Sequence, residues 1–507
     1  MKKRRKKGVK AKPKQEVLAS YSFISNRVPI QITIRTSRNE FVPIYEVSIR
    51  SISKNTDIIL DRIRHELISE VNIGMVDVLD IKNTGTIEQR LKNTIELLVK
   101  KHFPDADKDT EEFLVSYVIQ KSLGMGKVEI LMDDAKLEEI AINSAEEPVW
   151  VYHRDYGWVK TNINLQSEDQ IKHYAAMIGR KVGRQITIME PLMDANLTTG
   201  DRVNATISPI SLNGHTITLR KFASKPWTIT DFIKSGSISP AAASMIWLAI
   251  QYELSTLIAG GTASGKTSML NVVSNFFPPN QRIISIEDTH EIQLPKFLHW
   301  VPMITRLPNP EGKGGVSMLD LLVNSLRMRP DRIIVGEIRR KREAAVLFEA
   351  IHTGHSVYAT LHANSASETI TRLTSPPIDI PKTMIPALSL IIVQYRNRRS
   401  GLRRTFQIAE ILPDGNASVL MQLDINKDKL IKQNRSTALF NSIEMYTGMS
   451  RKVIQKDIDF KERVLNWMVK QGVDSVDTVG RVMAEYYTNQ GNLKQIVLAN
   501  RPFSSLS

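Results

Sequence analysis

The first half of the chain, from residue 16 to residue 222, mixes two kinds of hydrophobic pattern. Apolar residues recur at helical spacing in Ile59–Glu70, in TIEQRLKNTIELLVKKHF and in TEEFLVSYVIQKSLG. In EPVWVYHRDYGWVKTNI apolar and polar residues alternate, which predicts two half-buried strands. RVNATISPISLNGHTITLRKF predicts a hairpin that turns at Asn213-Gly214. We therefore expect residues 16–222 to form an α+β N-terminal domain.

From residue 241 the pattern changes to short, continuously apolar segments. STLIAG, RIIVGEI and SVYATLHA are each followed by a helical stretch, and RIISIED is another apolar run of strand length. Such alternation is typical of a parallel sheet with helices on its faces. TFQIAEILPDGNASVLMQL predicts a strand pair that turns at Asp414-Gly415, and residues 440–500 have helical spacing. Residues 241–507 are thus expected to form an α/β domain with C-terminal helices.

Residues 223–240 separate these halves and have a third composition. The segment ASKPWTITDFIKSGSISP contains two prolines, a glycine and several Ser or Thr residues, which favours a linker. We expect the two domains to close and reopen about this hinge linker.

The net charge of +15 is concentrated at the N-terminus. Residues 1–14 carry nine Lys or Arg and no acidic residue, so the rest of the chain nets only +6. We expect residues 1–15 to be a basic disordered tail. Such a tail could contact anionic lipid headgroups or nucleic acid, or it could serve only as solubilising charge.

Two absences from the sequence narrow the class of protein. The 507 residues include no cysteine, which excludes disulfides, cysteine-zinc sites and thiol catalysis and fits a reducing compartment. The best long apolar run, Ala241 to Ile258, is interrupted by Gln251 and Glu253, and the N-terminus lacks the apolar core of a secretory signal. We therefore expect a cytoplasmic protein without a membrane-spanning helix.

GGTASGKT matches the phosphate-binding pattern G-x-x-x-x-G-K-[ST], with the strand LSTLIAG before it and the helix TSMLNVVSNFF after it. Glycines let backbone N–H groups turn toward phosphates, and the helix N-terminus adds partial positive charge. Lys266 is then expected to reach the β- and γ-phosphates of ATP, and Thr267 to bind Mg²⁺. The alternative is a glycine-rich helix start without a ligand. The expected nucleotide-binding residues of this loop are Gly260, Gly261, Thr262, Ala263, Ser264, Gly265, Lys266, Thr267 and Ser268.

Acidic residues follow two of the apolar segments. Glu337 ends RIIVGEI, where a carboxylate can polarise the water that attacks the γ-phosphate. By itself it reads as a surface residue, but ligands of parallel sheets gather at the carboxyl ends of strands, which favours the catalytic role. Glu287 and Asp288 end RIISIED and Glu291 follows, so the three could contact Mg²⁺ through water. Alternatively, Asp288 caps a helix and Glu291 completes a capping-box-like arrangement.

Two histidines flank the strand in TGHSVYATLHAN, His355 before it and His362 after it. A lone histidine is usually a packing or hydrogen-bonding residue. A pair beside the catalytic edge of the sheet instead suggests that both sense the γ-phosphate.

Taken together, these motifs resemble those of the type II/type IV secretion-system ATPase superfamily, whose members are hexameric motors of pilus assembly, secretion and archaellum rotation. The resemblance covers about residues 130–500. It also includes LMDDAKLEEIAIN, the arginine-bearing GDRVNATI and TLRKF, and SLRMRPDRIIVGEIR, in which Glu337 matches the family's glutamate. The resemblance implies a RecA-like P-loop NTPase core that hydrolyses ATP with Mg²⁺.

The C-terminal segment EMYTGMSRKVIQKDIDFKERVLNWMVKQGV resembles the archaeal branch of this superfamily, with Arg463 and Trp467-Met468 in the helices after the core. Bacterial members usually carry a four-cysteine zinc module, so the lack of cysteine strengthens this assignment. In one departure, Arg340-Lys341 stand where relatives commonly have glycine, and the turn after Glu337 is expected to differ.

The resemblance further implies that arginines of one subunit's N-domain reach phosphates bound by its neighbour. Arg202 and Arg220 match those positions, and a guanidinium can stabilise charge on the transferring phosphoryl group; the alternative is a surface arginine on a hairpin. Arg327 could sense phosphate or form ion pairs between subunits. The implied catalytic residues are Glu337, Lys266, Arg202, Arg220 and His362, the further nucleotide contacts are Glu287, Asp288, Arg327 and His355, and the Mg²⁺ ligands are Thr267, Glu291 and Glu337.

The expected function is a hexameric ATPase motor for a type IV pilus, archaellum or related secretion filament, acting on a polytopic platform protein at the inner face of the cell membrane. A nucleic-acid or DNA-transfer motor is the first alternative, favoured by the tail and by Arg396, Arg398, Arg399, Arg403 and Arg404. No aromatic-plus-basic stripe for stacking bases accompanies them, so a nucleic-acid partner is not expected. The second alternative is a scaffold that binds nucleotide without hydrolysing it.

Overall fold

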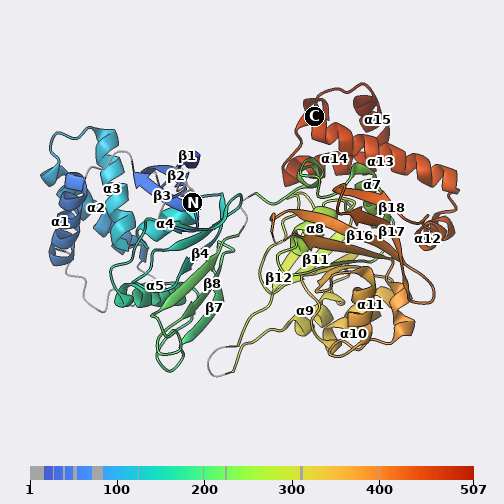
Figure 1. The fold of residues 1–507 in the computed structure, drawn as a ribbon, viewed down its shortest axis with the longest axis horizontal. Helices are drawn as coiled ribbons and strands as arrows, with labels where there is room; N and C mark the ends of the chain where they lie inside the picture. The colour runs from blue at the N-terminus through green and yellow to red at the C-terminus, as the bar shows by residue number, and fades with distance from the viewer. Residues whose placement is uncertain are drawn as a thin grey trace, which may run out of the picture. The chain divides into compact units, whose positions relative to one another are not determined.

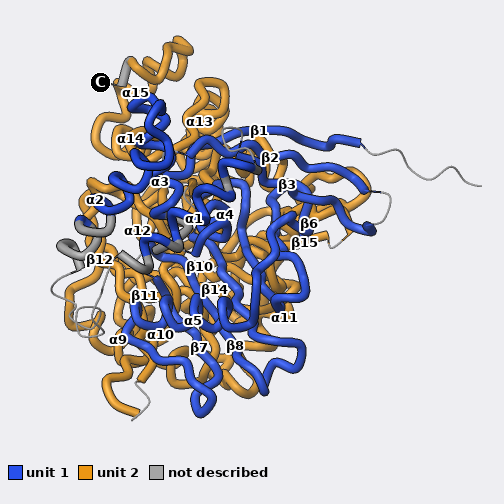
Figure 2. The backbone as a smooth tube through the Cα atoms, turned by 90° about the vertical axis from the view of Figure 1, so that its left-hand side faces the viewer, with its two compact units in different colours: residues 1–223 blue, residues 224–507 orange. Residues whose placement is uncertain are grey.

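The fold is described from a computed structural model of the chain. The chain divides into two compact units, residues 1–223 and residues 224–507 (Figure 2). The predicted basic tail lies outside the described residues. The structure describes residues 16–26, 28–37, 40–49, 54–70, 84–123, 125–197, 199–222, 225–308, 312–397 and 399–506.

One mixed sheet and a set of helices make up the first unit (Figure 1). The strand order is β1-β2-β3-β6-β5-β4-β9-β8-β7, and only the β3–β6 pair is parallel. In chain order the elements are β1 (Val17–Ser25), β2 (Val28–Arg35), β3 (Ile44–Ile49), α1 (Lys54–Glu70), α2 (Thr84–His102), α3 (Lys108–Leu123), α4 (Lys127–Asp133), β4 (Leu137–Ile142), β5 (Trp150–His153), β6 (Gly157–Thr161), α5 (Glu168–Lys181), β7 (Leu192–Asn196), β8 (Arg202–Thr206) and β9 (Thr216–Arg220).

The sequence patterns of this unit produce the elements they predicted. In β2 the side chains of Ile30, Ile32 and Ile34 are buried while those between them are not, as expected for a strand with one face on the core. The predicted hairpin is β8 paired with β9, but a loop over residues 207–215 joins the strands. Asn213 and Gly214 therefore lie at a bend within this longer loop and do not by themselves connect the two strands.

The second unit is a larger α/β structure. Its elements are α6 (Ile229–Lys234), α7 (Pro240–Gln251), β10 (Thr256–Gly260), α8 (Lys266–Ser274), β11 (Arg282–Glu287), β12 (His299–Ile304), α9 (Met318–Ser325), β13 (Arg332–Val335), α10 (Lys341–His352), β14 (Ser356–Leu361), α11 (Ala366–Thr374), β15 (Leu390–Arg396), β16 (Arg403–Ile411), β17 (Ala417–Asp424), β18 (Lys429–Lys432), α12 (Ala438–Thr447), α13 (Arg451–Gln471), α14 (Val476–Thr488) and α15 (Gln490–Leu498). The sheet order is β12-β11-β13-β14-β10-β15-β16-β17-β18.

Helices cover both faces of this sheet (Figure 1). The pairs from β12 to β15 are parallel, and β16, β17 and β18 extend the sheet in antiparallel fashion. Successive residues of β10 point into different cores: Ile258 packs with residues of α7, α8 and α13, whereas Leu257 and Ala259 pack with residues of α9 and α10. Because both faces are buried, the strands read as continuous apolar runs in the sequence.

The predicted linker, residues 223–240, is mostly part of the second unit. Helix α6 lies inside it, and Thr228 and Asp231 form a capping box at its start. Ile229, Phe232 and Ile238 are buried in the core of this unit. The Ser, Thr and Pro residues that suggested a linker serve here as helix caps and helix starts, and the break between the units falls at residues 223–224.

The C-terminal helices pack against α7 and the end of α8. Trp247 of α7 stacks on Phe276 with ring centroids 5.4 Å apart, and its Nε1 donates a hydrogen bond of 2.9 Å to Tyr487 Oη in α14. Lys461 is fully buried in α13 and bonds to Asp457 and Tyr486. Within the part of the chain that the structure describes, every helix is too short or too polar to cross a bilayer.

Candidate active site

The phosphate-binding loop connects the fully buried strand β10 to helix α8. A Cβ on Gly260 would lie 2.4 Å from Ser264 Oγ and 2.7 Å from the carbonyl oxygen of Gln394, so only glycine fits there. Gly265 has a φ of +93° immediately before α8 and no side chain to cap the helix. The first backbone N–H groups of α8 therefore remain available to an anion.

Lys266, the first residue of α8, points back over the loop. Its Nζ donates a hydrogen bond of 3.1 Å to the carbonyl oxygen of Gly261 and lies 3.3 Å from His362 Nε2. Burial lowers the pKa of Lys266, while the negative charges of Glu337 and Glu291 act in the opposite direction. The ammonium group is thus placed where phosphate oxygens would replace a backbone carbonyl as its partner.

Glu337 follows β13 and faces the same histidine. Its Oε1 lies 3.1 Å from His362 Nε2, and its side chain is 18% exposed. Burial and the charge of Lys266 lower the pKa of His362, against the opposing effect of Glu337. His362 Nε2 therefore lies between Lys266 Nζ and Glu337 Oε1, and the structure brings these three side chains together.

Sheet topology explains this convergence. Strands β13, β14 and β10 are neighbours and parallel. Their carboxyl ends lie at one edge of the sheet, so Glu337, His362 and the phosphate loop meet there although they are far apart in sequence.

Glu287 and Asp288, which follow β11, have separate partners. The buried Glu287 carboxylate accepts hydrogen bonds from the backbone N–H groups of Glu291 (3.0 Å) and Ile292 (3.1 Å). No helix begins at Asp288, so its interpretation as a helix cap is wrong. Asp288 instead accepts hydrogen bonds from Thr305 Oγ1 (3.0 Å) and from Arg339 (2.8 Å). Glu287 thus holds the turn that follows its strand.

The structure does not bring His355 and Arg327 to this edge. His355 precedes β14 and lies at the amino end of the strand, where it contacts Thr353 and the carbonyl oxygen of Ala350. Arg327 is exposed and precedes the amino end of β13. Both residues precede the amino ends of their strands, and a strand separates its two ends by roughly 3.3 Å per residue. Their predicted phosphate contacts stay predictions.

Arg202 and Arg220 belong to the first unit and lie directly opposite each other across the β8–β9 pair. Arg202 forms a two-pronged ion pair with Asp194, with distances of 3.0 and 2.6 Å. Arg220 is exposed at the end of β9. Their role toward a neighbour's phosphates stays a prediction.

Sequence reasoning missed two arginines. Arg339 donates hydrogen bonds of 2.9 and 2.5 Å to Glu337 Oε2 and one of 2.8 Å to Asp288 Oδ2, and so bridges the two acidic segments. Its position two residues after Glu337 was the available signal. Arg403 donates to the carbonyl oxygen of Ala263 in the loop, and the sequence placed it only in a cluster weighed for nucleic acid.

The departure at Arg340-Lys341 starts helix α10. Arg340 occupies the N-cap position, and its backbone N–H donates to Glu343 Oε2 at 3.1 Å. Among the described residues, no group of three or more His, Cys, Asp or Glu side chains is arranged to hold a metal ion.

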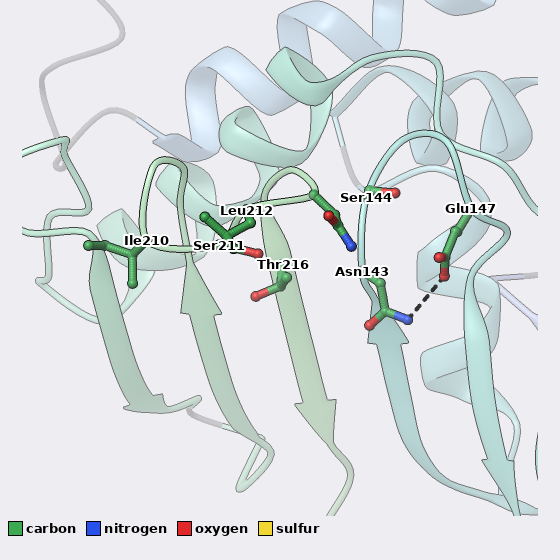
Figure 3. Close-up of a pocket in the computed structure, with 8 residues that line it drawn as sticks. Asn143, Ser144, Glu147, Ile210, Ser211, Leu212 and Thr216 are labelled. Atoms are coloured by element: carbon green, nitrogen blue, oxygen red, sulfur yellow. Dashed lines mark hydrogen bonds between the residues drawn. The ribbon is translucent and has the colours of Figure 1, made fainter.

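A separate cavity lies in the first unit and is lined by other residues (Figure 3). It has a volume of about 430 Å³ and is open to solvent, and the loop between β8 and β9 lines one side of it. Asn143 Nδ2 and Glu147 Oε2 lie 3.5 Å apart on its other side. It contains none of the predicted site residues, so the chemistry of the chain points to the phosphate loop.

The fold and the site define a P-loop NTPase with a RecA-like core, an α+β N-terminal unit and a helical C-terminal segment. Residues 121–410, more than half of the chain, match the sequence model of the family described as "Type II/IV secretion system protein". The chain belongs to this family and is an ATP-hydrolysing enzyme.

Similar proteins come from archaea and bacteria. An uncharacterized protein of Methanocaldococcus jannaschii, MJ0900, is 33% identical over 392 residues, which are 75% of this chain and 70% of that protein. The type IV secretion system protein PtlH homolog of Bordetella bronchiseptica is 28% identical over 301 residues, 53% of this chain and 88% of that protein. Among solved structures, the pilus retraction motor PilT with bound ADP aligns with a TM-score of 0.42 at 18% identity, covering 64% of this chain and 88% of that one.

Proposed function

We propose that this chain is the hexameric ATPase motor of an archaeal-type machine that assembles a type IV pilus, an archaellum or a related secretion filament. The observation that carries the proposal is the meeting of Lys266, His362 and Glu337 at one edge of the sheet. Together they offer a phosphate-binding cation and a carboxylate for the attacking water. Family membership supports work within a secretion system.

Mg²⁺ is the proposed cofactor of hydrolysis. It is commonly held by one or two protein groups together with substrate phosphates. Thr267 lies in the first turn of α8, and the charges of Glu291 and Glu337 act on the neighbouring Lys266. These oxygen atoms fit such a site, and the bound ion would supply neutralisation of phosphate charge.

In the proposed cycle, arginines from the first unit of a neighbouring subunit complete the site. Arg202 and Arg220 lie side by side on β8 and β9, so one movement of the unit carries both charges. Loss of the γ-phosphate removes the charge that holds them, and the units reopen. The same movement would act on a polytopic platform protein at the inner face of the membrane.

The first test concerns hydrolysis itself. Glu337→Gln removes the base without changing the size of the side chain, and we expect kcat to fall by about 10²- to 10⁴-fold while ADP still binds. Unchanged turnover in this variant would support a different base and would remove the main argument for the proposed chemistry.

The second test concerns the neighbouring subunit. Lys266→Ala and Arg220→Ala are each expected to be inactive. Mixing the two purified variants should restore up to roughly a quarter of wild-type activity, because some interfaces then pair an intact loop with an intact arginine in trans. A mixture that stays inactive, although it exchanges subunits, contradicts the arginine contact between subunits.

The third test separates a membrane motor from a DNA-transfer motor. Anionic vesicles are expected to raise the ATPase rate, and single-stranded DNA is not. Stimulation by DNA with a steep dependence on salt would favour the nucleic-acid alternative.

A further inference from the structure

The hairpin of β15 and β16 forms one wall of the phosphate loop. The carbonyl oxygen of Gln394 in β15 approaches Gly260 so closely that no Cβ fits between them. The buried side chain of Gln394 donates a hydrogen bond of 3.1 Å to Oγ1 of the equally buried Thr405 in β16. Loop and hairpin are therefore packed as one structure.

Arg403, the first residue of β16, reaches from this hairpin to the top of the loop. Its Nε donates a hydrogen bond of 3.2 Å to the carbonyl oxygen of Ala263. Ala263 has a φ of +57°, a backbone conformation that residues other than glycine rarely adopt unless their surroundings hold them in it. The hydrogen bond from Arg403 is one contact that stabilises this conformation of Ala263.

The backbone of Arg403 is held from the other direction by the segment before α7. Ser237 Oγ donates to the carbonyl oxygen of Arg403 at 3.1 Å, and the N–H of Thr405 donates to the carbonyl oxygen of Ser237 at 2.7 Å. Ser237 in turn contacts Ser235 through their hydroxyl groups, 2.9 Å apart. A continuous path of hydrogen bonds thus runs from Ala263 through Arg403 to residues 235–237.

We propose that Arg403 is a positioning residue that holds the phosphate loop in its binding conformation and couples the loop to residues 235–237. This inference deepens the proposed function and rests on it only in taking the loop as the nucleotide site. Residues 235–237 lie shortly after the break between the units in the chain. A change at Ala263 on phosphate binding would therefore reach the segment that leads to that break.

The experiment compares Arg403→Gln with Arg399→Gln. Arg399 is an exposed residue of the same hairpin, so its variant removes the same charge without touching the loop. In the nucleotide-free protein, Arg403→Gln is expected to speed backbone hydrogen exchange in residues 261–265 and 235–237. In titrations with a fluorescent ADP, its Kd is expected to rise about tenfold, as for the loss of one charge-assisted hydrogen bond. Arg403→Lys is expected to recover part of the affinity.

Equal exchange and equal Kd in the two glutamine variants would overturn the proposal. Faster exchange at residues 261–265 without a change at 235–237 would overturn the coupling. If Arg403→Gln does not fold, Ser237→Ala removes only the contact to the Arg403 carbonyl, and unchanged exchange at residues 261–265 in that variant would also overturn it. ADP binding and exchange require no turnover, so they remain informative even if the filament-motor function fails its own tests.

Discussion

Arg339→Gln is expected to slow ATP hydrolysis without weakening nucleotide binding. The guanidinium of Arg339 makes two hydrogen bonds to Glu337 Oε2 and one to Asp288 Oδ2. Among the described residues, the hydrogen bonds of its side chain go to these two carboxylates, and its charge acts on Lys266 of the phosphate loop only from a distance. Removing it frees the carboxylate of Glu337 to rotate and leaves Asp288 without this cation, whereas Lys266 and the loop keep their places.

The size of the effect follows from these contacts. A hydrogen bond between charged groups contributes about 1.5–3 kcal/mol, but the Arg339 side chain is 58% exposed, and solvent screening reduces that value. We assign roughly 1.5–2.5 kcal/mol to the whole bridge. If that energy orients Glu337 in the transition state, kcat falls by about 10- to 70-fold.

Phosphate release at saturating ATP measures kcat, and titration with a fluorescent ADP measures binding. Arg342→Gln is the matched control, because Arg342 is exposed on α10 and its loss removes the same charge. A kcat within twofold of wild type for Arg339→Gln, or an equal loss in Arg342→Gln, would refute the reasoning.

Three further predictions concern buried and titrating groups. His362→Asn should flatten the acid-side fall of kcat/KM that we expect in the wild type, because burial and Lys266 lower the pKa of His362 and favour its neutral form. Asp134→Asn should speed hydrogen exchange in β3, because Asp134 accepts hydrogen bonds from Tyr21 (2.6 Å) and Tyr45 (2.5 Å) worth about 1.5–3 kcal/mol each. Lys461→Met should remove a pH dependence of the free energy of unfolding. Burial lowers the pKa of Lys461 in the folded wild type to about 8, so between pH 8 and 10.5 the unfolded chain binds a proton that the folded protein has lost. The free energy of unfolding of the wild type therefore rises with pH over this range by roughly 3 kcal/mol.

Each of these has a control or a contradicting result. An acid limb that persists in His362→Asn assigns the titration to another group. Asp155→Asn, at a 60% exposed side chain, should leave exchange in β3 unchanged. Between pH 8 and pH 10 the free energy of unfolding, measured with denaturant, should rise in the wild type and stay nearly constant in Lys461→Met. An equal change in both proteins would contradict the lowered pKa of Lys461.

The elements of the second unit could be predicted because local pattern and final environment agree. β10, β13 and β14 are buried on both faces, and a strand with two buried faces is a continuous apolar run in the sequence. The phosphate loop was also readable, since Gly260 and Gly265 are required by close approach and by a positive φ, which are local properties.

Composition predicted the connection between the units less well than the hydrophobic pattern predicted the strands. Residues 229–240 contain the Ser, Thr and Pro residues of a linker, yet residues 229–234 form α6 and Pro240 begins α7. A helix cap and a linker use the same residue types, and only the burial of Phe232 and Ile238 distinguishes them.

His355 and His362 show the same limit at the active site. Both flank one strand, and the sequence treats them alike, but a strand carries its two ends to opposite edges of the sheet. His362 meets Lys266 and Glu337, whereas His355 does not.

The amino-acid sequence by itself determined the phosphate loop, the buried strands that carry Glu337 and His362, and membership of a family of secretion ATPases. These depend on neighbouring residues, whose spacing sets backbone conformation and burial. The tertiary structure decided which arginines contact the acidic segments and the phosphate loop. Arg339 and Arg403 reach Asp288 and Ala263 across 51 and 140 residues of chain, and such contacts exist only once parallel strands and a distant hairpin have been packed side by side.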